Sequence, residues 1–308
     1  LDGQDTGRVD PTPNAHRAGE EDVSEGEMAL ADLNADGFDD LVVATPEADL
    51  LSYTENGRVD VYYGSDLGLS AIPDEILAGD VSGALFGSSI SVGDFNNDGV
   101  HDLAVGAPGW HAANATSIDG LLNVYLGGES GLSTTPWSSV QGAVNESLGN
   151  EIVALHRLNT PDSLAVVASN HTTVVSAEET LHGKVNVYDG HEEGMVHVRN
   201  LTQSKKGNLF GRSLGACDIN NDGHDELIVG NTGSYDIISS FSSVEYFYGS
   251  SSGYDGTPDH TLESITQGRL LGYNIACMGD VNNDGFEDHL LTEPFNSSVT
   301  FGAGALWV

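Results

Sequence analysis

The sequence predicts an all-β fold, a β-propeller of about five four-stranded blades, from two observations. A short acidic loop occurs four times, and its first residues, Asp32, Asp94, Asp218 and Asp280, are separated by 62, 124 and 62 residues. Strand-like segments keep the same phase, and no amphipathic helical stretch of useful length is visible. Five units of 62 residues nearly fill the 308 residues, so we expect one domain, 1–308, of repeated units.

Each unit is expected to contain four strands in the same order. A Phe-Gly or Leu-Gly pair, such as Phe86-Gly87, starts the first strand, and the acidic loop leads to the second strand. A long polar loop then leads to an alternating third strand that begins at glycine, as in 120–126, and a less regular fourth strand follows. We expect the units at 23–84, 85–146, 147–208, 209–270 and 271–308, with 1–22 as a closing segment.

Each acidic loop presents oxygen atoms at positions 1, 3, 5 and 9 and a backbone carbonyl at position 7. Glycine at position 6 permits a sharp turn, and the ligand number and flexibility suit Ca2+ better than Mg2+. We therefore expect four calcium sites between first and second strands. The expected ligands are Asp32, Asn34, Asp36, Phe38 and Asp40; Asp94, Asn96, Asp98, Val100 and Asp102; Asp218, Asn220, Asp222, His224 and Glu226; and Asp280, Asn282, Asp284, Phe286 and Asp288.

Two other interpretations of the loop were considered. An EF-hand needs Glu at position 12 and flanking helices, but position 12 is Val43, Val105, Val229 or Leu291 within a strand-like run. The loops could also be Asx-turns that use Asp and Asn only for hydrogen bonds to the backbone. Four copies in phase, each with an acid at position 9, favour the metal.

The unit between the second and third acidic loops has lost its carboxylates. At the expected phase the chain reads His156-Arg157-Leu-Asn-Thr-Pro-Asp162, so an arginine stands where a cation would bind. We expect no metal there. The strand that follows, 164–168, is kept, so the blade should keep its structure.

These motifs together resemble FG-GAP repeats over nearly the whole chain. The Phe-Gly start, the DxNxDG loop and Gly106-Ala107-Pro108 carry the resemblance, although Gly-Ala-Pro is complete only in the second unit. Such repeats build the N-terminal propeller of integrin α subunits and occur in GPI-specific phospholipase D and microbial surface proteins. Family propellers commonly have seven blades, so this chain is expected to be either a true five-bladed ring or part of a larger one.

Composition limits the partners and the location. The formal net charge is −37, from 47 acidic and 10 basic residues, and such a surface repels nucleic acids and anionic membranes. No transmembrane run or signal peptide is visible, and the chain begins with Leu1, so we expect a processed or trimmed product. The expected calcium sites fit an extracellular or cell-surface location. Cys217 and Cys277 lie on the first strands of neighbouring units, either as a disulfide or as two buried thiols.

Ligands are expected on the face opposite the metals, which carries the long loops between second and third strands. The resemblance to integrins implies the same face. Large or aromatic residues in these loops are Tyr53, Trp110, His111, His171, Tyr235 and Phe295. Each could instead only pack its own loop.

The first functional expectation is a calcium-stabilised adhesion or ligand-binding module that binds a protein or a glycan and is not an enzyme. The motif 249–253 matches a serine nucleophile elbow, but the same phase elsewhere keeps only the glycines, which indicates a turn. A second expectation is self-assembly, because the last unit ends at its third strand, 305–308, and leaves a strand edge open. A third is a secreted hydrolase or lyase.

Overall fold

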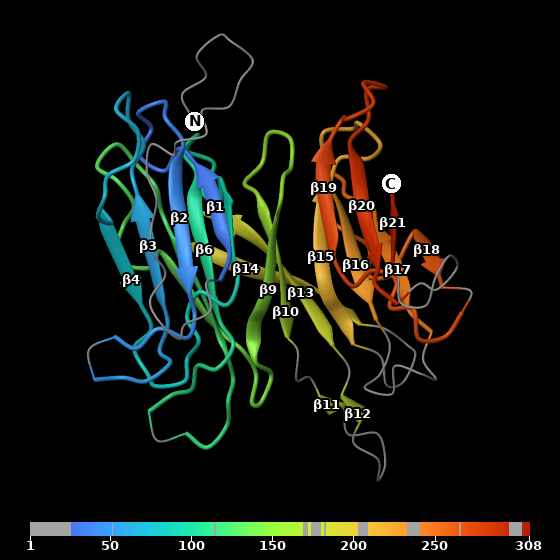
Figure 1. Ribbon diagram of the computed structural model, residues 1–308, viewed down its shortest axis with the longest axis horizontal. Coiled ribbons are helices and arrows are strands. Elements are labelled where there is room, and N and C mark those ends of the chain that lie inside the picture. Colours follow the sequence, from blue (N-terminus) through green and yellow to red (C-terminus); the bar gives the residue numbers. More distant parts are fainter. Residues whose placement is uncertain are drawn as a thin grey trace.

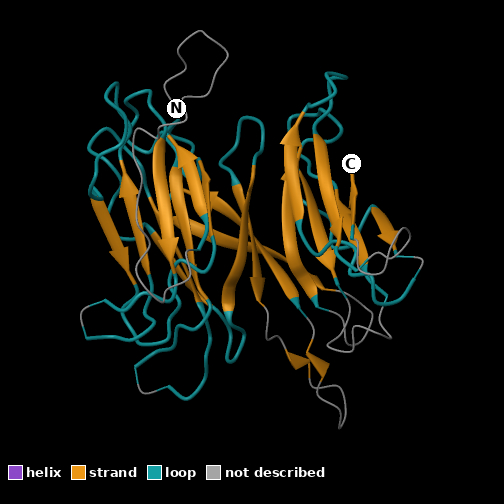
Figure 2. Cartoon of the chain, in the orientation of Figure 1, coloured by secondary structure: helices purple, strands orange, loops and turns teal. Residues whose placement is uncertain are grey.

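The computed structural model confirms the predicted architecture. It describes residues 26–50, 52–113, 115–168, 172–173, 180–181, 183–202, 209–232, 241–264, 266–295 and 304–308. Within these ranges the chain forms strands, turns and short bridges and no helix (Figure 2). Consequently, no described segment is a helix of the length and hydropathy needed to span a bilayer.

Five antiparallel sheets follow one another along the chain, and each is a blade whose strands pair in order (Figure 1). The blades are β1 (Met28–Ala31), β2 (Asp40–Thr45), β3 (Arg58–Tyr62) and β4 (Glu75–Ala78); β5 (Ile90–Gly93), β6 (Asp102–Ala107), β7 (Leu121–Tyr125) and β8 (Ser138–Gln141); β9 (Leu148–Leu155), β10 (Ser163–Ala168), β13 (Lys184–His191) and β14 (Gly194–Thr202); β15 (Phe210–Cys217), β16 (Glu226–Asn231), β17 (Ser243–Phe247) and β18 (His260–Glu263); and β19 (Ile275–Gly279), β20 (Asp288–Glu293) and β21 (Ala305–Trp307). A small hairpin, β11 (Thr172–Thr173) and β12 (Thr180–Leu181), stands apart.

The last blade has three strands in the described residues, as the repeat phase predicted. Its third strand, β21, is paired with β20 only, and Leu306 and Trp307 are exposed. The segment expected to cover this edge, residues 1–22, lies outside the described residues. Self-association through the edge therefore stays a prediction.

The core lies between the faces of neighbouring blades. In the first four blades the second and third strands are largely buried on both faces, and for this reason they read as nearly continuous apolar runs such as Leu103-Ala-Val-Gly-Ala107. The aromatic residue of the Phe-Gly start is an anchor between blades: Phe86 and Phe210 are each 2% exposed. The following glycine, Gly87, has φ +91°, and a Cβ there would press against Val59 and Ala44 of the preceding blade.

The first strands of adjacent blades are joined by polar contacts along the inner side. Glu27 accepts hydrogen bonds from Ser89 Oγ (3.0 Å) and from the backbone N–H of Ile90 (2.8 Å) in the next blade. Ser89 Oγ in turn accepts the N–H of Ile152 at 3.0 Å. These bonds place the half-buried carboxyl of Glu151 in the same region. Burial, followed by repulsion from Glu27, raises the pKa of Glu151 to about 7, and Arg212 opposes the shift.

We expect Glu151→Gln to stabilise the protein at alkaline pH. A carboxyl whose pKa is raised on folding stabilises the fold below its unfolded value of 4.5, and this contribution is lost as the pH rises through about 7. The variant and the parent should have equal free energies of unfolding near pH 4. The variant should be more stable by on the order of 2 kcal/mol at about pH 8. Urea denaturation across this range, with calcium saturating, measures the difference, and a constant difference would contradict the assignment.

Candidate metal sites and ligand face

The four acidic loops share one backbone conformation and lie at the same end of the propeller, at the top of Figure 1. Position 4 of each loop has φ between 58° and 60°, at Ala35, Asn97, Asn221 and Asn283. The glycine at position 6 has φ between 86° and 94°, which a residue with a side chain adopts only under strain. The prediction of a sharp, glycine-dependent turn is confirmed.

The first Asp of each loop is oriented by the loop's own backbone. Its two oxygens accept the N–H groups of positions 5 and 6; in the first loop these bonds join Asp32 to Asp36 (3.2 Å) and Gly37 (2.9 Å). The same pair recurs at Asp94, Asp218 and Asp280. A carboxylate oxygen has two acceptor sites, so these bonds leave capacity for a cation.

The acid at position 9 begins the second strand and is buried in three of the four loops, at Asp40, Asp102 and Glu226. Asp102 accepts the N–H groups of Phe95 (2.9 Å) and of Gly127 beyond the third strand (3.0 Å). Burial raises the pKa of Asp102 to about 7, and Asp98 and Asp94 add to the shift by repulsion. The pKa of Glu226 rises to about 7 for the same reason, with Asp222 and Asp218 as its neighbours.

As the side chains stand, no three His, Cys, Asp or Glu residues within the described part of the chain are arranged to hold a metal ion. The loop carboxylates instead bond to nearby backbone N–H groups, which is the hydrogen bonding expected of Asx-turns. The donor set nevertheless fits a hard cation, because it consists of oxygen atoms clustered in a region of excess negative charge. The Oδ1 of Asn220, a predicted ligand, is buried and has no hydrogen-bond partner among the described residues.

The third loop differs from the first two in the partner of its Asn side chain. Glu226 Oε1 accepts a bond from Asn220 Nδ2 at 3.0 Å, whereas in the first two loops the Asn amide nitrogen bonds to the position 5 Asp. The fourth loop resembles the third here, since Asn282 Nδ2 donates to Asp288 at 3.2 Å. The four loops therefore form two pairs.

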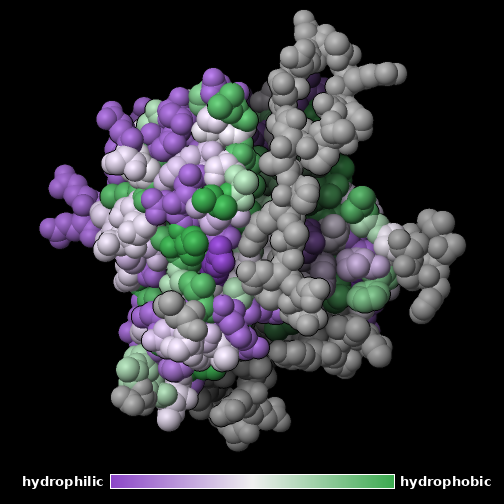
Figure 3. Space-filling view, turned by 60° about the vertical axis from the view of Figure 1, so that its left-hand side comes forward, coloured by the Kyte–Doolittle hydropathy of each residue, from purple (hydrophilic) through white to green (hydrophobic). Residues whose placement is uncertain are grey.

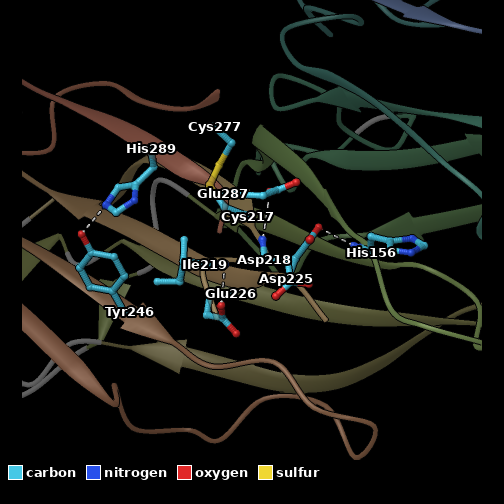
Figure 4. Close-up of a disulfide and its surroundings, with 10 residues drawn as sticks. All are labelled: His156, Cys217, Asp218, Ile219, Asp225, Glu226, Tyr246, Cys277, Glu287 and His289. Carbon is cyan, nitrogen blue, oxygen red and sulfur yellow. Dashed lines mark hydrogen bonds between the residues drawn. A yellow bond between two sulfur atoms is a disulfide. The ribbon is translucent and has the colours of Figure 1, made fainter. Parts of the chain in front are cut away.

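An acid at position 8 joins neighbouring blades, a role that the sequence analysis missed. Asp225 accepts the backbone N–H of His156 in the preceding blade at 2.7 Å, and Glu287 accepts that of Asp218 at 3.1 Å (Figure 4). Asp162 accepts the N–H of Asp94 in the same way at 2.9 Å. The recurrence of an acid at position 8 in three of the four loops was the available signal. A loop is thus linked to the next blade at the end that carries the predicted metals.

A disulfide joins the last two blades beside these links. Cys217 on β15 and Cys277 on β19 are bonded, with their Cα atoms 5.8 Å apart, so of the two states left open by the sequence the structure has the disulfide (Figure 4).

Replacing both Cys217 and Cys277 with serine should lower the free energy of unfolding by about 3 kcal/mol, because the bond closes a long loop in the unfolded chain. Thermal and denaturant melts of the variant and parent, both with calcium, provide the measurement. Mass spectrometry of the alkylated parent is the control, and two free thiols there, or equal melts, would refute the expectation.

Arg157 fills the position where the third blade lacks an acidic loop. Its guanidinium is buried, with Nη1 3.1 Å from Asp189 Oδ2 and 3.2 Å from Ser163 Oγ. Nη2 donates to the carbonyl oxygen of Ser251 in the next blade at 3.2 Å. In the third blade, an arginine of the chain itself therefore occupies the place where the other blades have their predicted metal sites.

The long loops between second and third strands lie at the opposite end, at the bottom of Figure 1. Of the predicted ligand-face residues, Tyr53 and Phe295 are exposed, at 38% and 50%. Trp110 is half-buried, and its indole N–H donates to Asp80 Oδ1 at 3.0 Å. His111 is half-buried beside Ala112. His171 and Tyr235 lie outside the described residues.

The fold and the loops define a class, a β-propeller with acidic loops at one end of its blades. Residues 27–62, 86–119 and 210–254 match the FG-GAP repeat, and these segments contain three of the four acidic loops. The chain thus carries FG-GAP repeats, and the resemblance noted in the sequence is confirmed in the first, second and fourth blades. Neither the third blade, which has lost its loop, nor the fifth blade, which has one, lies within the matched residues.

Similar proteins carry the same repeats. The chain is 44% identical over 115 residues to phosphatidylinositol-glycan-specific phospholipase D of Mus musculus. The aligned region covers 35% of this chain and 14% of that protein. It is 34% identical over 118 residues to integrin alpha-4 of Xenopus laevis, 38% of this chain and 11% of that protein. It is 42% identical over 111 residues to integrin alpha-PS5 of Drosophila melanogaster, 35% of this chain and 10% of that protein. The chain is homologous to a small part of each.

Proposed function

We propose that this chain is an extracellular, calcium-stabilised and non-catalytic module that binds a protein or glycan. The observation that carries the proposal is the separation of two kinds of loop, acidic loops at one end of the blades and long loops with aromatic residues at the other. Homology to integrin α subunits supports a binding role, and the disulfide supports an oxidising, extracellular setting.

Calcium in this proposal has a structural role. The loop oxygens named in the sequence analysis would hold the ions, and the ions would neutralise carboxylates that otherwise repel one another. Because the second to fifth blades are bonded to one another at this end, that end of the propeller would be stiffened. A stiff scaffold presents the opposite loops in one arrangement, which lowers the entropy lost on binding.

The surface charge makes anionic partners unfavourable. The side of the molecule that carries β3 and β4 is mainly hydrophilic, with apolar side chains in small separate patches (Figure 3). With a formal charge of −37, the chain should repel nucleic acids and anionic lipid surfaces. Neutral or basic ligands are therefore favoured.

Binding of the labelled protein to arrays of extracellular-matrix proteins and of glycans tests the proposal. We expect specific binding in calcium and loss of binding in chelator. Tyr53→Ala combined with Phe295→Ala should weaken binding to a ligand that uses the long-loop face, whereas replacement of the exposed Leu67, on another turn, by Ala is the matched control. Absence of any binding in calcium would contradict the function.

A further inference from the structure

A groove on the rim of the propeller separates the first two blades. It lies between the end of β4 in the first blade and the outer strands β7 and β8 of the second, and its volume is about 520 Å³. This is within the range of pockets that hold small molecules. Trp110, one of the predicted ligand-face residues, forms part of its wall.

The groove combines aromatic and uncharged polar side chains. Alternation along β7 places Asn123 and Tyr125 on the face toward the first blade. Ser139 and Gln141 of β8 lie on the same face, because they pair with Asn123 and Leu121. The floor therefore offers a phenol, two amides and a hydroxyl beside an indole.

These groups are held in place by bonds among themselves. Asn123 is 9% exposed; its Oδ1 accepts Ser139 Oγ at 2.7 Å and its Nδ2 donates to Tyr125 OH at 3.3 Å. Gln141 Nε2 donates to Asp119 at 2.9 Å. An amide nitrogen has two N–H groups and a phenol both donates and accepts, so capacity for a ligand remains. Burial raises the pKa of Tyr125 to about 12, so its hydroxyl stays neutral at physiological pH.

The charge of the lining narrows the ligand class. Among the described residues, the lining contains one acidic residue, Asp80, and no Lys, Arg or His. In a strongly acidic chain this arrangement disfavours phosphates, sulfates and carboxylates. An extended peptide would be bound through the backbone groups of an open strand edge, such as the outer edges of β4 and β8, whereas the floor of the groove is formed by the side-chain faces of β7 and β8. Side-chain amides and hydroxyls beside an aromatic ring suit a ligand rich in neutral hydroxyl groups.

The matching position of the third blade is closed. Its aromatic residue, Tyr188, is covered by the ring of His197, with centroids 5.4 Å apart. Lys184 stands at the position of Leu121 and is paired with Glu146. The backbone N–H of Met195 donates a hydrogen bond to Ser138 Oγ of the second blade at 3.0 Å. The groove between the first two blades is thus not repeated between the second and third blades.

We propose that the groove between β4 and β7–β8 binds a short, neutral oligosaccharide, with Trp110 as the stacking residue and Asn123, Ser139 and Gln141 as hydrogen-bonding residues. This inference rests on the proposed function, since it names one class of ligand for a binding module. It also places that ligand on the rim beside the long loops rather than on the tips of the loops.

Isothermal titration with defined saccharides tests the inference. The probes are cello-, chito-, manno- and galacto-oligosaccharides of three to five sugars, compared with sialyllactose and a heparin fragment, all in saturating calcium. At least one neutral probe should bind, with little or no binding of the charged ones. Two variants, the single substitution Trp110→Ala and the double substitution Ser139→Ala with Gln141→Ala, should each weaken binding roughly tenfold or more.

Tyr248→Ala is the matched control, because Tyr248 is an exposed aromatic residue of the fourth blade that lies outside the groove and outside the predicted ligand face; the affinity of this variant should stay unchanged. Ser139 and Gln141 are exposed, so their replacement by Ala should preserve folding, which thermal melts check. Binding of charged probes alone, or full affinity in the folded groove variants, would overturn the inference. If proteins bind on the arrays but none of these saccharides does, the inference fails and the proposed function stands. If nothing binds, both fail.

Discussion

Removal of calcium by a chelator is expected to lower the melting temperature by more than about 10 °C. An ion that binds only the folded chain stabilises it by about 2.7 kcal/mol at a concentration one hundred times its Kd, and four sites are expected. The loops concentrate carboxylates, and in the calcium-free protein these repel one another as they ionise, which adds to the loss of stability.

The number of ions is as informative as the melt. Equilibrium dialysis with metal analysis should give four calcium ions per chain and none for the third blade. Asp98→Ala should reduce the number to three, since Asp98 is exposed and its loop is otherwise kept. Magnesium at the same concentration should stabilise the chain less, because its small, rigid octahedron fits a flexible loop poorly. An unchanged melt in chelator, or far fewer than four ions, would leave Asx-turns as the explanation of the loops.

The repeat made most of the fold predictable. Phase alone located the blades, because each unit must bury its faces against two neighbours and so keeps the same apolar second and third strands. The glycine at position 6 predicted the turn, since few other residues adopt the required φ. The acid at position 9 marked the start of the second strand. The absence of a fourth strand in the described part of the last blade also followed from phase.

Contacts between blades were harder to predict. Asp225 bonds to a backbone group 69 residues away, and any acid on a loop tip looks solvated until the neighbouring blade is placed beside it. The groove is a space left unfilled between β4 and β8, and a sequence pattern shows which side chains are present but not where neighbouring blades leave a gap. Whether the cysteines pair depends on the rotation between blades, which spacing alone does not determine.

Arg157 illustrates both outcomes. The sequence indicated that a cation of the chain stands at the lost loop. Its partners, Asp189 on β13 and Ser251 on the turn after β17, are distant in the sequence and were not predictable. A hydrogen bond from its Nη2 connects the third blade to the carbonyl of Ser251 in the fourth, much as the acids at position 8 connect blades elsewhere. In this blade the guanidinium of Arg157 supplies the positive charge beside Asp189.

Replacing Arg157 with Met should lower the free energy of unfolding by about 3 kcal/mol. Methionine fills much of the space but leaves Asp189 without its partner and the Ser251 carbonyl without a donor, and such groups are costly to bury. The free energy of unfolding of Arg157→Lys should lie between those of the parent and of Arg157→Met, because lysine keeps the charge but cannot donate from two nitrogen atoms in the guanidinium geometry. Denaturant melts in calcium and in chelator measure the effect.

The comparison between the two media is decisive for the role of this residue. If Arg157 replaces a metal, its loss should cost the same in calcium and in chelator, whereas a loop variant such as Asp98→Ala should matter only in calcium. Arg157→Met combined with Asp189→Leu should recover part of the stability, since it removes the stranded carboxylate together with the charge. A loss that disappears in chelator would mean that Arg157 acts through a neighbouring calcium loop and does not substitute for one.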